Sequence, residues 1–167
     1  MTSEEAAGSA DRPEPSPARV VADADVLAAD VLCEGSARDA LDRVREHSWV
    51  TLVASDPLVD DAAAVVADLA DAGLAADWRE RVDAVREPVS HPTGDHPALA
   101  SAYRGGAMHV LSFDDRLVGP RAGAGLADRF PVSVREPAAF AAVFDPASLH
   151  AEAVGGDYPG PDRDPRE

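Results

Sequence analysis

Acidic residues follow two apolar runs of the sequence, and their positions suggest metal chemistry. Asp23 and Asp25 come directly after the run 19–22, and Asp114 comes just after the run 108–112. If both runs are parallel strands of one sheet, these side chains lie at the carboxyl edge, where α/β proteins bind their ligands. Clustered carboxylates bind hard divalent cations such as Mg²⁺ or Mn²⁺ through oxygen. The pattern therefore predicts an acidic site for one of these metals.

Two more aspartates are candidates for the same site, and each also has an ordinary structural explanation. Asp61 lies three residues after Leu58 and four before Val65, on or beside the apolar stripe of a predicted helix. A lone carboxylate is costly to bury, so Asp61 either pairs with an arginine, lies at the edge of the stripe, or serves a metal site. Asp95 stands at the predicted N-cap of a helix that begins near Pro97. Capping by itself would explain an aspartate there, and metal binding is the alternative.

The elements that would position these residues alternate along the chain. Short apolar runs are typical of buried strands, and segments of helical periodicity separate them. The alternation predicts an α/β fold, a three-layer sandwich with a central parallel sheet of about four to five strands and helices on both faces. The predicted strands are 19–22, 49–54, 108–112 and 132–134, and the predicted helices are 25–33, 36–47, 56–72, 74–86, 95–103 and 137–144, with 146–150 as an extension of the last.

The two ends of the chain differ in composition from its middle. Residues 1–17 are acidic and proline-rich with no hydrophobic periodicity, which is typical of a disordered tail, and 154–167 have the same character. The folded domain is then expected at 18–153. The acidic start does not have the pattern of a secretory signal, and no apolar run approaches the ~20 residues of a membrane span. We therefore expect a cytoplasmic protein with no membrane partner.

Composition excludes several classes of function. The 167 residues include 31 acidic and 15 basic side chains, a net charge of −16, which excludes a basic nucleic-acid footprint and a polybasic membrane surface. There is no lysine, so Walker A and Schiff-base chemistry are excluded. The single cysteine, Cys33, excludes an internal disulfide. Asp outnumbers Glu 21 to 10, and this skew resembles the proteome of a salt-accumulating halophile, where most acidic residues solvate the surface.

The order of these elements resembles that of PIN-domain nucleases over residues 19–143. In that family a first strand ends in a catalytic aspartate, here Asp23, and a later strand ends in Ser or Thr, one residue and Asp, here Ser112 to Asp114. Between them a strand ends in Ser, here Ser55, and leads into a helix with an acidic residue, here Asp61. The segments that carry the resemblance are RVVADADVLAADVL, TLVASDPLVDDAAAV, GDHPALASAYRGGAMHVLSFDDRL and PVSVREPAAF.

The resemblance implies a ribonuclease that hydrolyses RNA phosphodiester bonds with Mg²⁺ or Mn²⁺ as cofactor. It implies that Asp23, Asp95 and Asp114 are the metal ligands and that Asp61 completes the acidic pocket and orients the water. Ser112 is then expected to hydrogen-bond a ligand carboxylate. Asp25, where the family often has Asn, and Asp115 are lesser candidates.

The same resemblance implies partners. RNA would be the substrate, with phosphate contacts from Arg104, Arg116 and Arg121, which follow elements of the site. A toxin-like role with an antitoxin-like protein partner, and a homodimer, are further expectations.

Two other interpretations remain open. The domain could keep the PIN-like fold with a degenerate site and act as an interaction module. Alternatively, Asp23 and Asp25 resemble the paired aspartates of haloacid-dehalogenase phosphatases, in which the first is the nucleophile and the second the acid or base. That family also uses a basic residue near the phosphate, and no lysine is present here. His91 and His96 flank Asp95 and are interpreted as surface-loop residues.

Overall fold

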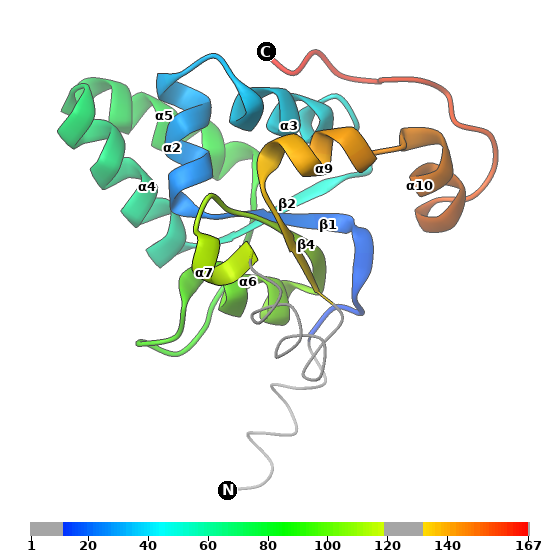
Figure 1. The fold of residues 1–167 in the computed structure, drawn as a ribbon, viewed down its shortest axis with the longest axis horizontal. Coiled ribbons are helices and arrows are strands. Elements are labelled where there is room, and N and C mark those ends of the chain that lie inside the picture. The colour runs from blue at the N-terminus through cyan, green and yellow to red at the C-terminus, as the bar shows by residue number, and fades with distance from the viewer. Residues whose placement is uncertain (1–11, 119–131, 167) are drawn as a thin grey trace, which may run out of the picture.

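The computed structural model describes residues 12–118 and 132–166, and within them the strands form one five-stranded sheet in which every pair is parallel (Figure 1). This confirms the predicted α/β class with its central parallel sheet. The order across the sheet is β3-β2-β1-β4-β5, so β1 lies at the centre. The strands are β1 (Ser16–Ala22), β2 (Thr51–Ser55), β3 (Glu87–Val89), β4 (Ala107–Leu111) and β5 (Ser133–Arg135).

Strand β3 has no counterpart in the predicted elements. It has only three residues, and the middle one is Pro88, which has no N–H to give to a sheet. Proline is tolerated in an edge strand, and β3 is paired on one side only, with β2. So short a strand shows no periodicity in the sequence, which is why pattern analysis missed it.

Helices form most of the segments between the strands, and capping residues in the sequence mark where two of these helices begin. Ser55 caps α4, because its side chain accepts a hydrogen bond from the N–H of Leu58, and Asp71 caps α5 through the N–H of Leu74. The predicted boundary at Gly73, between the helices 56–72 and 74–86, is therefore wrong, since α4 ends at Leu69 and Gly73 lies inside the first turn of α5. The helices are α2 (Ala24–Leu32), α3 (Ser36–Arg45), α4 (Asp56–Leu69), α5 (Ala72–Val85), α6 (Pro97–Gly105), α7 (Asp115–Val118), α9 (Pro137–Val143) and α10 (Pro146–Ala153).

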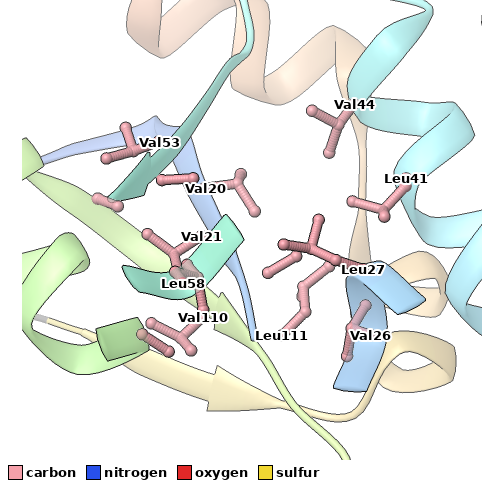
Figure 2. Packing of buried hydrophobic residues seen from close by; sticks show 14 of the residues in the cluster. Val20, Val21, Val26, Leu27, Leu41, Val44, Val53, Leu58, Val110 and Leu111 are labelled. Atoms are coloured by element: carbon pink, nitrogen blue, oxygen red, sulfur yellow. The ribbon is translucent and has the colours of Figure 1, made fainter. Parts of the chain in front are cut away.

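The layers follow from burial of the central strand. Val20 and Val21 are neighbours in β1, so they point to opposite faces of the sheet, and both are 0% exposed. Both faces are therefore covered. Helices α2, α3 and α9 lie on one face and α6 on the other (Figure 1). Leu27 and Leu41 point from α2 and α3 toward the strands, within the core shown in Figure 2.

Helix α6 approaches the sheet closely at its last residue. A Cβ atom built on Gly105 would overlap the Cγ1 atom of Val53 in β2 and lie 3.2 Å from that of Val89 in β3. Glycine is thus the residue that lets the end of α6 lie against β2 and β3. This contact sets the start of β4, which follows two residues later.

The two ends of the chain pack more closely than the sequence predicts. Ser16 and Pro17 belong to β1, and the N–H of Ser16 donates to the carbonyl of Gly106. The C-terminal segment, residues 154–166, includes Tyr158, whose hydroxyl lies 2.5 Å from Nε2 of His47. The side chain of Asp162 accepts a 2.7 Å hydrogen bond from the N–H of Ser48. These specific contacts differ from the free tail expected for this segment.

No helix in the described part of the chain combines the length and apolar character of a membrane span.

Candidate functional site

The strand order places the candidate site at the centre of the sheet. The chain moves from β1 through β2 to β3 on one side and then returns to β4 on the other side of β1. The reversal makes the gap between the carboxyl ends of β1 and β4 the topological switch point, where parallel α/β sheets bind ligands. Ala22 pairs with Leu111 at these ends. The next residues, Asp23 and Ser112, therefore leave the sheet side by side.

Three hydrogen bonds fix the main-chain N–H and the carboxylate of Asp23. Its N–H donates to the carbonyl of Leu111 at 2.8 Å, which extends the β1–β4 pairing by one bond. One carboxylate oxygen accepts the N–H of Ala24 at 2.8 Å and so caps α2. The other accepts the hydroxyl of Ser112 at 2.9 Å, and Ser112 is 0% exposed. The side chain thus has a fixed position between β4 and the start of α2.

Ser112 also holds Asp114. Its hydroxyl oxygen accepts the N–H of Asp114 at 3.0 Å, so one buried hydroxyl joins the two aspartates. The guanidinium of Arg116 donates to both carboxylate oxygens of Asp114, at 3.1 and 3.0 Å. These hydrogen bonds hold the pKa of Asp114 below its ordinary value. Asp114 is therefore ionised at neutral pH.

Asp25 is the third carboxylate at this point. It lies in the first turn of α2, and one of its oxygens accepts the N–H of Phe113 at 3.2 Å. Partial burial raises the pKa of Asp25, and the charges of Asp23 and Asp114 raise it further. The side chain keeps contact with solvent, so water screens part of this repulsion. We call Asp23, Asp25 and Asp114 the acidic cluster.

The structure does not join Asp61 to this cluster by any hydrogen bond or ion pair among the described residues. The buried face of α4 consists of Leu58, Val59, Ala62 and Val66, and Asp61 is exposed. The predicted stripe is wrong in part, because Val65 is 37% exposed. The helix thus turns Asp61 to solvent.

Asp95 is exposed and does not cap α6. The N-cap is the next residue, His96, whose side chain makes no capping hydrogen bond. His96 is near enough to Asp114 for its charge to contribute to the lowered pKa of that carboxyl. The loop before α6 therefore approaches the acidic cluster, although Asp95 has no hydrogen bond to the cluster within the described ranges.

His91, interpreted from the sequence as a surface-loop residue, makes a specific contact in the structure. Its Nε2 atom lies 2.9 Å from the hydroxyl of Ser55, the buried residue that ends β2 and caps α4. The contact anchors the loop after β3 to the neighbouring strand. No local pattern could reveal it, because the two residues are 36 positions apart.

The cluster supplies the oxygen donors that Mg²⁺ or Mn²⁺ prefers, but it is not assembled as a ligand set. Among residues 12–118 and 132–166 no three His, Cys, Asp or Glu side chains are arranged to hold a metal ion. Both carboxylate oxygens of Asp114 instead accept hydrogen bonds from Arg116. Arg121, a predicted phosphate contact, lies outside the described residues.

Fold and site together define a parallel α/β domain with an acidic cluster at its switch point. The chain belongs to a family of unknown function, DUF7384, whose model matches residues 14–166. The matched region includes the C-terminal segment, in agreement with its specific contacts on the domain. A comparison with curated proteins and a comparison with solved structures gave no significant match.

Proposed function

We propose that the protein is a metal-dependent ribonuclease whose active site is the acidic cluster. The observation that carries the proposal is the buried hydroxyl of Ser112, which joins Asp23 and Asp114 at the carboxyl ends of neighbouring strands. A protein gains no stability from bringing like charges together unless something else compensates. Arg116 compensates the charge of Asp114 in this structure, and a shared cation is the compensation that we propose for the whole cluster. The order of elements shared with PIN-domain nucleases supports the same reaction.

The raised pKa of Asp25 supports a cation at this place. Negative potential from Asp23 and Asp114 is one of its causes, and a divalent ion would relieve that potential. Asp23 and Asp114 would hold the ion, with Asp25 or Asp95 as the third donor. When bound, Mg²⁺ or Mn²⁺ would supply a more acidic water and stabilise charge on the phosphate. The donor chemistry fits these ions, and Asp114 must exchange Arg116 for the metal.

The residues of the chain would then divide the remaining work. Ser112 would orient the carboxylate of Asp23 through its hydrogen bond and hold it at the carboxyl end of β4, where the metal would bind. Arg116, whose side chain is 89% exposed, can leave Asp114 and bind a substrate phosphate. Arg104, the other described arginine that the resemblance suggested, lies in the last turn of α6, beside the amino ends of β1 and β4, and so on the opposite edge of the sheet from the cluster. Asp61 would act on the attacking water only if substrate brings α4 nearer to the cluster.

The partners named by the resemblance belong to this proposal as well. RNA is the substrate, and an antitoxin-like protein and a second copy of the chain are the expected protein partners in the cytoplasm. A net charge of −16 disfavours RNA in dilute salt. Concentrated salt weakens that repulsion, because the Debye length falls to ~3 Å at 1 M.

The test is cleavage of a mixed RNA pool at molar KCl with Mn²⁺, Mg²⁺ or EDTA. We expect metal-dependent cleavage that Asp23→Asn and Asp114→Asn abolish. Asp68→Asn is the matched control, because Asp68 is exposed on α4 and lies outside the acidic cluster. Absence of cleavage together with absence of Mn²⁺ binding by calorimetry would reject the proposal in favour of an interaction module.

A second candidate, a phosphatase of the haloacid-dehalogenase type, is favoured by one observation. Asp25 follows Asp23 by two residues, and its raised pKa suits a group that gives or takes a proton. In this case Asp23 attacks the phosphate. Hydrolysis of p-nitrophenyl phosphate without RNA cleavage, lost in Asp23→Asn and slowed in Asp25→Asn, would support the phosphatase over the nuclease.

A further inference from the structure

A concave region lies away from the acidic cluster. It is a cavity of about 660 Å³ between α2, α3, β2 and α5, and its lining includes Val50, just before β2, and Val85, just before β3. These positions place it toward the amino ends of the two strands, whereas the acidic cluster lies at the carboxyl ends. Its volume is that of a small-molecule site.

The interior of this cavity is apolar. Its lining includes Leu41 and Val44 from α3, Leu52 from β2, and Trp78 and Val82 from α5. Trp78 is only 8% exposed, so its indole is a wall of the cavity and not a surface side chain. An aliphatic or aromatic group of a ligand would lose contact with water here, at about 25 cal/mol for each Å² buried.

The charge of the lining is opposite to that of the whole molecule. Five of the chain's 15 basic residues line the cavity, against four of its 31 acidic residues. The lining is therefore slightly positive in a protein of net charge −16. The arginines concerned are Arg38, Arg45, Arg81, Arg163 and Arg166.

Three of these arginines already make an ion pair or hydrogen bond with another residue of the chain. Arg45 pairs with the buried Asp30, and Arg166 lies 3.5 Å from Asp42. Arg38 donates to the carbonyl of Asp30 at 3.1 Å. The side chains of the other two, Arg81 and Arg163, are exposed and make no hydrogen bond or ion pair with the residues that the structure describes.

The C-terminal segment forms one wall of the cavity. Residues 163–166 line it, and main-chain hydrogen bonds from Asp162 and Arg163 to the carbonyl of Glu46, at 2.9 and 3.1 Å, hold this wall in place. The site is therefore formed before a ligand arrives, and binding does not bear the cost of ordering that wall.

We propose that this cavity binds a small amphipathic anion, with an apolar tail against Trp78 and Leu52 and a carboxylate or phosphate head on Arg81 and Arg163. The anionic head is inferred from the positive charge of Arg81 and Arg163, and the apolar tail is inferred from the apolar side chains of the lining. A neutral molecule would leave both arginines unused, and a cation would meet a lining in which five arginines face four aspartates. The proposal is independent of the nuclease proposed above, because no residue of the acidic cluster lines the cavity.

The experiment follows Trp78 fluorescence in the full-length Trp49→Phe variant, in which Trp78 is the remaining tryptophan. Decanoate and decyl phosphate are titrated against decanol and decyltrimethylammonium, each below its micelle concentration. We expect saturable binding of one or both anions, at least tenfold tighter than decanol, and no binding of the cation. The ratio of the two anions' affinities distinguishes a carboxylate head from a phosphate head.

Variants test the residues. Arg81→Gln combined with Arg163→Gln should weaken anion binding about tenfold or more, whereas Arg43→Gln, on the outer side of α3, should leave it unchanged. Ala84→Phe places bulk into the cavity from an exposed position of α5 and should abolish binding while the circular dichroism spectrum stays that of the parent. Equal affinity for decanol and the anions, or unchanged binding in the double variant, would overturn the proposal.

Discussion

Replacing Ser112 with alanine is expected to destabilise the domain and to release the acidic cluster. The hydroxyl donates to the carboxylate of Asp23 at 2.9 Å and accepts the N–H of Asp114 at 3.0 Å. Alanine removes both bonds at once. Because Ser112 is 0% exposed, water does not replace the hydroxyl at its own position.

The magnitude follows from the two bonds. A hydrogen bond to an ionised group contributes about 1.5–3 kcal/mol, and an unpaired main-chain N–H costs about 1–3 kcal/mol if it stays buried. Asp23 and Asp114 are only partly buried, so water can reach some of the freed groups and the lower ends of these ranges apply. The free energy of unfolding should therefore fall by about 2–3 kcal/mol.

Urea unfolding followed by tryptophan fluorescence, at neutral pH and fixed KCl, measures this change. Ser101→Ala is the matched control, because Ser101 is also 0% exposed, and among the residues that the structure describes its hydroxyl accepts a single N–H, that of Ser55, at 3.3 Å. We expect a loss of about 1 kcal/mol or less there. Ser112→Thr keeps the hydroxyl and should lie nearer the wild type than Ser112→Ala.

One result would refute this reasoning. If Ser112→Ala costs no more than Ser101→Ala, the hydroxyl does not hold Asp23 and Asp114 together.

Three further predictions concern other parts of the fold. Because the pKa of Asp25 is raised in the folded state, the free energy of unfolding falls as pH rises from the ordinary Asp pKa through the raised one. Asp25→Asn should flatten this fall when urea unfolding is measured across that pH range. The same pH dependence in the variant and the wild type would contradict the prediction. Asp30→Ala leaves the guanidinium of Arg45 without its buried partner and should lower the free energy of unfolding by about 2–4 kcal/mol. The loss is smaller than for a fully isolated charge, because Asp42 lies 3.4 Å from Arg45. Adding Arg45→Met to the Asp30→Ala variant should restore part of the loss in a double-mutant cycle. Gly105→Ala should cost about 1–3 kcal/mol in thermal unfolding through overlap with Val53, and a melting temperature equal to that of the wild type would show that α6 can shift.

The α/β class and the central strands were predictable because their signals are local. The run before Asp23 is apolar without alternation, as a strand covered on both faces requires, and the structure makes it the central strand β1. The helix starts at Ser55 and Asp71 carry capping side chains that act within three residues. The boundary between α4 and α5 was misplaced because Gly73 resembles a helix stop, whereas the cap at Asp71 starts α5 before it.

The acidic cluster was predictable only in part. Asp23 and Asp114 follow strands, so the rule for carboxyl ends of parallel sheets brings them to one edge. Their meeting also needs β1 and β4 to be neighbours, and nothing in the local sequence states that order. Asp61 and Asp95 are also aspartates near predicted elements of the site. The fold nevertheless leaves both exposed and without hydrogen bonds to the cluster among the described residues.

The sequence by itself determined most of the strands and helices, although not β3 or α7, and it showed that acidic side chains follow two of the strands. These signals are local, because backbone preference and burial periodicity act over a few residues. The tertiary structure decided which carboxylates meet, that His91 reaches Ser55, and that the C-terminal segment closes a cavity with an arginine-rich lining. Such contacts join residues far apart in the chain. Strand order and the packing of whole elements set them, and no local pattern records either.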